Sequence, residues 1–150
     1  MSHMPVREAE VADVEEICAL IEEHARFEGN DTLALDRADM TKHLFGTEPK
    51  AWVLIAESPG DGVVAGMAFC SWNFSTWAGR PGIWLDDLYV RPRYRRHGLG
   101  NELLAALRAR TDGRVEWDMR EGNDRAAAFY AQLGAEPVPG WIRYRWSPGS

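Results

Sequence analysis

The order of elements in residues 83–119 constrains the fold more than any other feature. The apolar run 83–90 predicts a strand, a glycine turn then opens a helix over residues 101–110, and residues 114–119 predict another strand. Parallel neighbouring strands need a crossover connection, usually a helix, because a tight hairpin turn joins only antiparallel strands. The second half of the chain therefore predicts a parallel strand pair in an α/β arrangement.

The remaining segments predict one domain with a mixed sheet flanked by helices. We expect an α/β (α+β) fold with the order β-α-α-β-β-β-α-β-α-β, in which the second and third strands form an antiparallel hairpin. Asp36 and Asn123 stand at the starts of two helices and are suited to cap them. The other expected strands are 6–9, 51–57, 63–72 and 141–146, and the other expected helices are 11–27, 36–44 and 123–133.

Composition limits the function classes. The net charge is −6, whereas nucleic-acid-binding domains are usually basic, so we expect no nucleic-acid partner. The sequence has neither a membrane-spanning apolar run nor a leader, and its two cysteines lie in apolar surroundings, so we expect a cytoplasmic protein without a membrane partner. Residues 1–3 have the character of a cloning scar, which leaves residues 4–150 as one domain.

The turn from Arg95 to Asn101 combines arginines and two glycines at the start of a helix. Free N–H groups, the helix dipole and the missing glycine side chains favour a bound phosphate there, although a plain helix start with surface arginines is the structural alternative. Leu103 stands where the dinucleotide fingerprint requires a third glycine, and the Gly-Lys-Ser/Thr of ATPase loops is missing. The sequence therefore disfavours both of those nucleotide motifs.

The pattern Arg-x-x-Gly-x-Gly, filled by Arg95, Gly98 and Gly100, resembles the acetyl-CoA signature of the GCN5-related N-acetyltransferase (GNAT) superfamily. A second pattern, from Asn123 to Gly134, is also similar to this family and follows in the right order. The resemblance covers nearly the whole chain. It implies an N-acetyltransferase that uses acetyl-CoA as cosubstrate and transfers the acetyl group to a primary amine by direct attack in a ternary complex.

Within the superfamily, the sequence most resembles the spermidine/spermine (diamine) acetyltransferase branch, through residues 26–28, 74–90 and 140–141. It departs from that branch at Leu85-Asp86-Asp87, where Leu-Glu-Asp is frequent, and by lacking a Trp before Asn123. The resemblance implies a polyamine or diamine as the amine substrate. The alternatives are a lysine analogue, an amino acid, an antibiotic or a protein N-terminus, and a non-enzymatic acetyl-CoA sensor.

The resemblance also implies where the cofactor lies. The strand end would pair with the pantetheine arm like an added strand, an N–H near Leu88 would stabilise the oxyanion, and the turn amides would hold the pyrophosphate. The expected cofactor-binding residues are Leu88, Tyr89, Val90, Arg95, Arg96, His97, Gly98, Leu99, Gly100, Asn101, Asn123 and Ala126.

Two residues are the catalytic candidates. Tyr130 matches the family tyrosine near the thioester sulfur, and a phenol with its high pKa can protonate a departing thiolate. The alternative is a tyrosine that packs on the sheet. Asp86 matches the carboxylate that binds the amine and helps to deprotonate it, because an ammonium has no lone pair for attack. An exposed acidic strand end without a chemical role is the alternative for Asp86.

The substrate candidates are acidic and aromatic. Asp87 would be the electrostatic partner of Asp86, and Glu28 matches a substrate-contacting position of the diamine branch. Trp77, Trp84 and Trp141 have the character of walls of an amine channel with cation–π contacts, although a core position is the alternative for each. The histidines have no metal-ligand spacing, so we expect no metal. Members of this branch are commonly dimers, and the aromatic segment 141–146 is a candidate interface.

Overall fold

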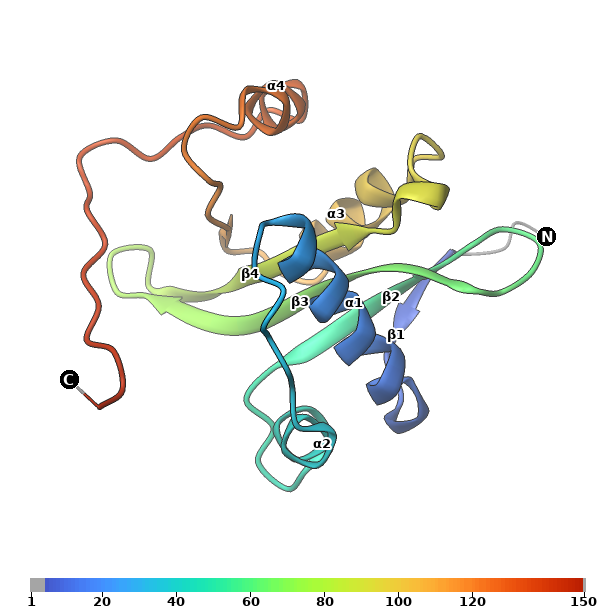
Figure 1. Cartoon of the computed structure of the whole chain (residues 1–150). Coiled ribbons are helices and arrows are strands. Elements are labelled where there is room, and N and C mark those ends of the chain that lie inside the picture. Colours follow the sequence, from blue (N-terminus) through green and yellow to red (C-terminus); the bar gives the residue numbers. More distant parts are fainter. Residues whose placement is uncertain (1–4, 150) are drawn as a thin grey trace. The chain divides into compact units, whose positions relative to one another are not determined.

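The computed structural model describes residues 5–149, so the expected cloning scar at residues 1–3 lies outside the described residues. The chain divides into two compact units, Met1–Trp117 and Asp118–Ser150, and each is described by itself. The described residues form four α-helices and five strands, shown in Figure 1.

The first unit is built on a five-stranded mixed sheet with the order β1-β2-β3-β4-β5. The pairs β1–β2, β2–β3 and β3–β4 are antiparallel, whereas β4 and β5 are parallel, as the element order predicts. A crossover that contains the helix α3 joins this parallel pair. The strands are β1 (Val6–Glu8), β2 (Trp52–Glu57), β3 (Val64–Ser75), β4 (Arg80–Val90) and β5 (Val115–Glu116).

The three helices of this unit are α1 (Val14–Phe27), α2 (Arg37–Phe45) and α3 (Leu99–Arg108), with short 3-10 turns at Val11–Asp13 and Pro92–Tyr94. In Figure 1, α1 passes in front of the sheet and α3 lies behind it. The predicted cap of α2 is confirmed, because the carboxylate of Asp36 accepts a hydrogen bond of 2.9 Å from the N–H of Asp39.

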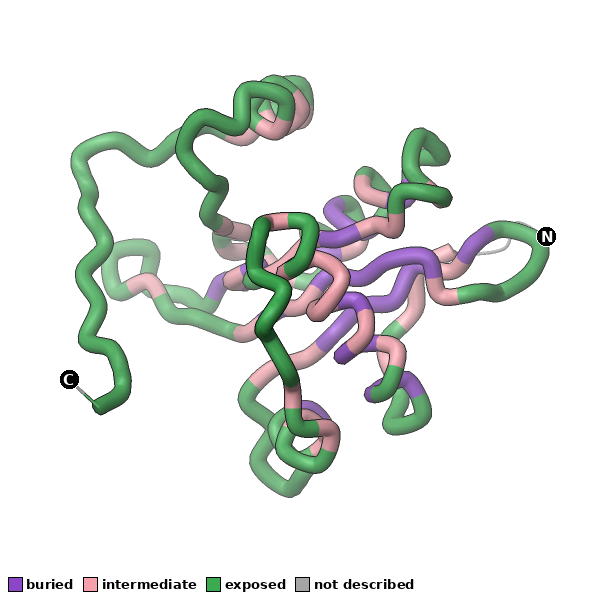
Figure 2. Tube along the Cα trace, viewed as in Figure 1, coloured by how far each residue is buried: buried purple, intermediate pink, exposed green. Residues whose placement is uncertain are grey.

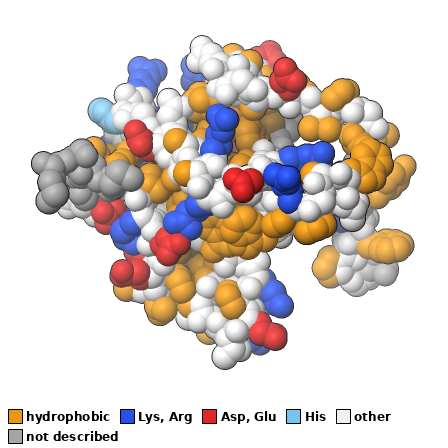
Figure 3. All heavy atoms as spheres, turned by 180° about the vertical axis from the view of Figure 1, so that it is seen from behind, with side chains coloured by type: hydrophobic (Ala, Val, Ile, Leu, Met, Phe, Trp, Pro, Cys, Tyr) orange, Lys and Arg blue, Asp and Glu red, His pale blue; other side chains and the backbone are white. Residues whose placement is uncertain are grey.

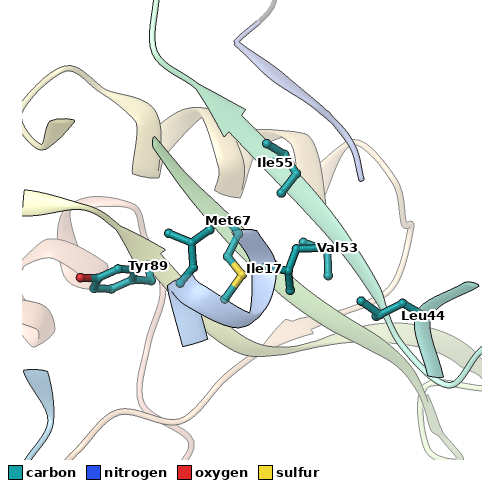
Figure 4. Packing of buried hydrophobic residues seen from close by; sticks show 7 residues of the cluster. Ile17, Leu44, Val53, Ile55, Met67 and Tyr89 are labelled. Carbon is teal, nitrogen blue, oxygen red and sulfur yellow. The ribbon is translucent and has the colours of Figure 1, made fainter. Parts of the chain in front are cut away.

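Strand alternation explains why the sheet is covered on both faces. Val53 and Ile55 of β2 point to the side of α1 and α2, where they pack in one cluster with Ile17, Met67 and Tyr89 (Figure 4). The intervening Leu54 points to the other side and is fully buried. The central strands therefore consist of continuous apolar runs. Figure 2 shows that burial is concentrated on these strands.

Ion pairs attach α1 to the sheet beside the core. Arg91, directly after β4, donates to the carboxylates of Glu23 at 2.9 Å and Glu16 at 2.8 Å, and also to the carbonyl of Val64 at 2.9 Å. Glu16 and Glu23 are two turns apart, so they share one face of α1. This arginine fixes the end of β4 against the helix and thereby holds the start of the glycine turn.

The second unit contains α4 (Asp124–Gln132), whose predicted cap is confirmed by a 3.1 Å bond from the N–H of Ala126 to the side chain of Asn123. The prediction of a last strand over residues 141–146 is wrong, because this segment forms neither helix nor strand. Its backbone meets no ladder partner among the described residues, so its alternating aromatic pattern alone does not make a strand.

Candidate functional site

Strands β4 and β5 separate soon after they meet. Their ladder consists of two pairs, Ile83 with Val115 and Trp84 with Glu116, while β4 continues to Val90. Beyond Trp84, this edge of β4 has no ladder partner among the described residues, and Leu88 and Val90 are half-buried there. An open edge of this kind presents N–H and C=O groups to which an amide-bearing chain can pair.

A β-bulge lies beside this opening. Phe69 of β3 pairs with Asp87 and the next residue, Cys70, pairs with Leu85, so Asp86 is the inserted residue at this point of the ladder. One strand thus contributes an extra residue, which bends it and redirects the side chain at that point. The bulge accommodates the consecutive carboxylates that a regular pleat would place on opposite faces. Asp86 is exposed and Asp87 is half-buried.

The glycine turn lies between the end of β4 and the start of α3. Gly98 precedes the helix in the left-handed conformation, with φ of 79°, and Arg96 is also left-handed, with φ of 68°. A left-handed arginine costs free energy that a glycine at this position would not, so its presence marks a constrained turn. Alternating left-handed residues orient successive N–H groups toward one point, which makes a concave site for an anion.

The amides of this turn are available to a ligand. Within the described part of the chain, the N–H groups of residues 96–101 meet no acceptor, and the first helical bond runs from Glu102 to the carbonyl of Gly98. The helix dipole adds partial positive charge at this end. Residues 96–98 and Asn101 are exposed, whereas Leu99 is buried beneath the turn. The geometry is that of a phosphate-binding helix start.

Arg95 supports the turn from the side. Its Nε donates to the carbonyl of Val90 at 2.8 Å, and its guanidinium lies over the rings of Phe27 at 5.2 Å and Tyr89 at 5.7 Å. These contacts tie the turn to β4 and to the end of α1. Arg95 is exposed, so part of its guanidinium remains available to an anion near the turn.

The structure brings Asp87 and Glu28 to one side chain that sequence reasoning did not select, His24. Its Nδ1 lies 3.1 Å from Asp87, its Nε2 lies 3.5 Å from Glu28, and its ring stacks on Tyr89 with centroids 5.0 Å apart. The sequence holds one signal for half of this cluster, because His24 and Glu28 are four residues apart on one helix. The contact with Asp87 is tertiary and has no local signal.

The cluster stabilises the protonated form of His24. The hydrogen bond with Asp87 raises the pKa of His24 above its ordinary value, and the charges of Asp87 and Glu28 add to this effect, while burial opposes it. Each of the three side chains is between 23% and 34% exposed, so the group remains accessible from solvent.

Two of the three predicted aromatic walls are exposed. Trp77 lies in the turn between β3 and β4 with 82% of its surface accessible, and Trp141 of the second unit is 68% accessible. Within its own unit, neither ring therefore belongs to a packed core. Trp84 of β4 is half-buried.

Tyr130 lies on α4 in the second unit. It is half-buried, its ring centroid is 5.6 Å from that of Phe129, and burial raises the pKa of its phenol. Asn123 and Ala126 form the cap of the same helix, so the side-chain oxygen of Asn123 already accepts one N–H. A tyrosine that keeps its proton at neutral pH is suited to act as an acid.

A family comparison decides between the possible uses of this geometry. The profile described as Acetyltransferase (GNAT) family matches residues 14–135, which include the glycine turn, the bulge and Tyr130. The chain belongs to the GNAT family. It is an N-acetyltransferase that takes its acetyl group from acetyl-CoA.

Curated relatives and solved structures agree with this. The thialysine N-epsilon-acetyltransferase of Bos taurus is 29% identical over 97% of this chain and 94% of its own length. The human spermidine/spermine N(1)-acetyltransferase-like protein 1 is 34% identical over 71% of this chain and 16% of its own length. A possible acetyltransferase from Clostridium difficile has the same fold, with a TM-score of 0.78 and 22% identity over 95% of each chain.

The residues of this GNAT acetyltransferase fit the cofactor. The turn offers amides without acceptors for a diphosphate, and the open edge of β4 offers backbone groups for the amides of the pantetheine arm. No group of three or more His, Cys, Asp or Glu in residues 5–149 is arranged to hold a metal. None of the described helices is long and apolar enough to span a bilayer.

A hollow of about 330 Å³ lies elsewhere in the first unit of this GNAT acetyltransferase. It is lined by residues of β1, β2 and β3, by the end of α2 and by Arg110 just after α3; Trp52 and Trp72 are among the lining residues. None of the predicted site residues lines it, so it has no part in the function proposed below.

Proposed function

We propose that this enzyme acetylates a primary amine of a small molecule that carries a second positive charge, such as a diamine or polyamine. The observation that supports this most is the convergence of Asp87 and Glu28 on one imidazole, beside the bulged Asp86. Three carboxylates in this neighbourhood attract cations more strongly than a single acid would.

The chemistry assigned to the chain begins at Asp86. It binds the substrate ammonium and accepts its proton, directly or through a water, so that the nitrogen gains a lone pair. Asp87 and Glu28 bind the second positive charge. Trp77 and Trp141 offer ring faces to the cationic chain between the two nitrogens.

Acetyl-CoA supplies the acetyl group as an activated thioester. The amides of residues 96–101 bind the diphosphate, with Arg95 and Arg96 as additional positive charge, and Leu88, Tyr89 and Val90 pair with the pantetheine arm. The N–H of Leu88 would donate to the acyl oxygen, which gains negative charge as the amine nitrogen attacks. Tyr130 would donate its phenolic proton to the sulfur when the carbon–sulfur bond breaks, and the proton that the nitrogen loses on forming the amide would restore the phenol. Asn123 and Ala126, at the start of the same helix, are the further proposed cofactor-binding residues.

A lysine-like amine is the second candidate, because the bovine relative is named for thialysine and aligns with nearly the whole chain. Such a substrate carries a carboxylate, which the acidic side chains would repel. The two candidates therefore predict opposite rankings of diamines and amino acids.

A substrate panel tests the proposal. Acetyl-CoA is mixed with 1,4-diaminobutane, spermidine, butylamine, lysine or thialysine, and release of the free thiol is followed. We expect the largest kcat/KM for the diamine or spermidine. Preference for lysine or thialysine would replace the proposal with the second candidate, and preference for butylamine would contradict both.

A variant pair examines the role of Asp86. Asp86→Asn removes the negative charge and the proton acceptor at the bulge, so kcat/KM for amines should fall about 100-fold or more, the usual contribution of a positioned base. Asp112→Asn changes an exposed carboxylate outside the predicted site and should leave kcat/KM unchanged. Equal activity of both variants would show that Asp86 is a bystander.

We also propose that the enzyme is a homodimer and that residues 141–146 contribute to the interface. Four large side chains of this segment are 68% to 98% exposed, namely Trp141, Ile142, Tyr144 and Trp146. Apolar surface of this kind is typical of association sites. Sedimentation equilibrium should give a dimer mass that Trp146→Ser lowers toward the monomer, and a monomeric wild type would refute the proposal.

We further propose a cytoplasmic location. Cys18 and Cys70 are both free and buried, and burial raises the pKa of the Cys70 thiol to about 12. Two unpaired thiols are usual for a protein of a reducing compartment.

A further inference from the structure

His24 stands between two predicted substrate-binding carboxylates. It lies on α1, one turn before Glu28, and its imidazole reaches across to β4. The Nδ1 contact with Asp87 is 3.1 Å and the Nε2 contact with Glu28 is 3.5 Å. Stacking on Tyr89, with an interplanar angle of 20°, fixes the plane of the ring between them.

The protonation state of His24 decides how many carboxylates it can satisfy. An imidazolium has two N–H donors and serves both acids, whereas a neutral imidazole has one donor and serves only one of them. Protonated His24 is therefore a cation that the protein itself supplies, and its two ring nitrogens contact Asp87 and Glu28.

Other charges surround this group. Asp86 is the neighbour of Asp87 in the bulge, and Arg95 covers the ring of Tyr89 on which His24 stacks. The charges felt at Tyr89 also include Glu23, Arg91 and Arg26. Glu23 is paired with Arg91. The acids in direct contact with His24 are Asp87 and Glu28.

We propose that His24 is a specificity-determining residue that competes with the second ammonium of a diamine for Asp87 and Glu28. The inference rests on the proposed function, in which these acids bind that ammonium. When His24 is charged, both acids are occupied and a diamine has no advantage over a monoamine. When His24 is neutral, it gives up its bond to one of the two acids, and the diamine is preferred.

The test compares kcat/KM for 1,4-diaminobutane with kcat/KM for butylamine between pH 6 and pH 8.5. Both amines stay protonated in this range, because alkylamines titrate near 10, as lysine does. The ratio of the two values therefore removes the ionisation of the nucleophile. For the wild type we expect the ratio to rise about three- to fivefold with pH, the size of a partly exposed ion pair.

Three variants sharpen the test. His24→Gln keeps a donor without a charge and should give a high ratio at every pH, whereas His24→Lys keeps a positive charge and should give a low ratio at every pH. His43→Gln alters an exposed histidine on α2 and should retain the wild-type profile. Circular dichroism confirms that each variant is folded before it is assayed.

A spectroscopic measurement tests the contact itself without turnover. The imidazole resonances of His24 should titrate at higher pH in the wild type than in Asp87→Asn, because the hydrogen bond to Asp87 favours the charged ring. Equal midpoints would overturn the inference at its structural basis.

The kinetic outcomes separate this inference from the function on which it rests. If amines are acetylated but the ratio is independent of pH and unchanged in His24→Gln, the role of His24 is overturned and the function stands. If no amine is acetylated under any condition, the proposed function fails and the inference falls with it.

Discussion

Tyr130 holds its proton more tightly than an exposed phenol, because burial raises its pKa. We expect Tyr130→Phe to lower kcat about 100-fold, the usual contribution of a positioned acid, while the Kd for acetyl-CoA measured by calorimetry stays the same. Asp112→Asn, at an exposed carboxylate outside the predicted site, is the control and should leave both quantities unchanged. A fully active Tyr130→Phe would assign the residue to packing.

The His24–Asp87 pair makes the stability of the fold depend on pH. Its contact with Asp87 raises the pKa of His24, so the stabilisation is fully present below the unfolded-state pKa and is lost as pH rises through the folded-state value. We expect Asp87→Asn to lower Tm clearly near pH 6 and much less near pH 9. Asp112→Asn should follow the wild type, and a Tm difference that grows with pH would contradict this sign.

At the scale of elements, the approach of β4 to β5 requires glycine. A Cβ on Gly82 would lie 2.6 Å from the carbonyl oxygen of Arg114, and a Cβ on Gly113 would overlap the carbonyl of Pro81. We expect Gly113→Ala to lower the free energy of unfolding by about 1–3 kcal/mol, as overpacking does.

Urea denaturation of Gly113→Ala measures this cost, and Asp112→Ala at the adjacent exposed position is its control. A change in acetyl-CoA affinity should accompany the loss of stability, because the two ladder pairs after Gly113 define where β4 and β5 begin to separate. A Gly113→Ala variant as stable as the wild type would exclude the close approach.

The sequence predicts most elements because their signals are local. Asp36 and Asn123 cap their helices, and the apolar periodicity locates α1, α3 and the β2–β3 hairpin within a few residues. The strand predicted over 141–146 fails for a different reason. Its pattern shows which residues share a face, but strand formation requires a partner strand, and no local signal supplies one.

The site residues also divide into those with a local sequence signal and those that depend on tertiary contacts. The glycine turn is predictable, because the spacing of its glycines and the start of the following helix lie within one short stretch of sequence. The presence of the bulge is predictable, since adjacent carboxylates in an apolar strand indicate a break in the pleat. The pairing register at the bulge is not predictable from these residues. The role of Arg91 and the cluster around His24 depend on contacts between α1 and β4, so no short stretch of sequence contains them.

At the scale of the whole molecule, charge governs the encounter with substrate. The net charge is −6, and Figure 3 shows basic and acidic side chains interspersed on one face. Between 0.01 M and 0.1 M salt the screening length falls from about 30 Å to about 10 Å. We expect kcat/KM for 1,4-diaminobutane to fall several-fold over this range.

Butylamine is the control for this salt series, because its single charge should make the decline smaller. The comparison also separates the amine from the cofactor, since salt weakens the binding of an anionic diphosphate equally in both assays. An identical decline for the two amines would place the whole salt effect on acetyl-CoA.

Asp86 is the surplus residue of β4, since Leu85 and Asp87 already oppose successive residues of β3. A chain shortened by that one amino acid would still alternate correctly along the entire hairpin and would form a straighter, tighter pair of strands. Foldability alone therefore has no use for the extra residue. Its use is instead the role proposed for Asp86 above, the binding of the amine substrate.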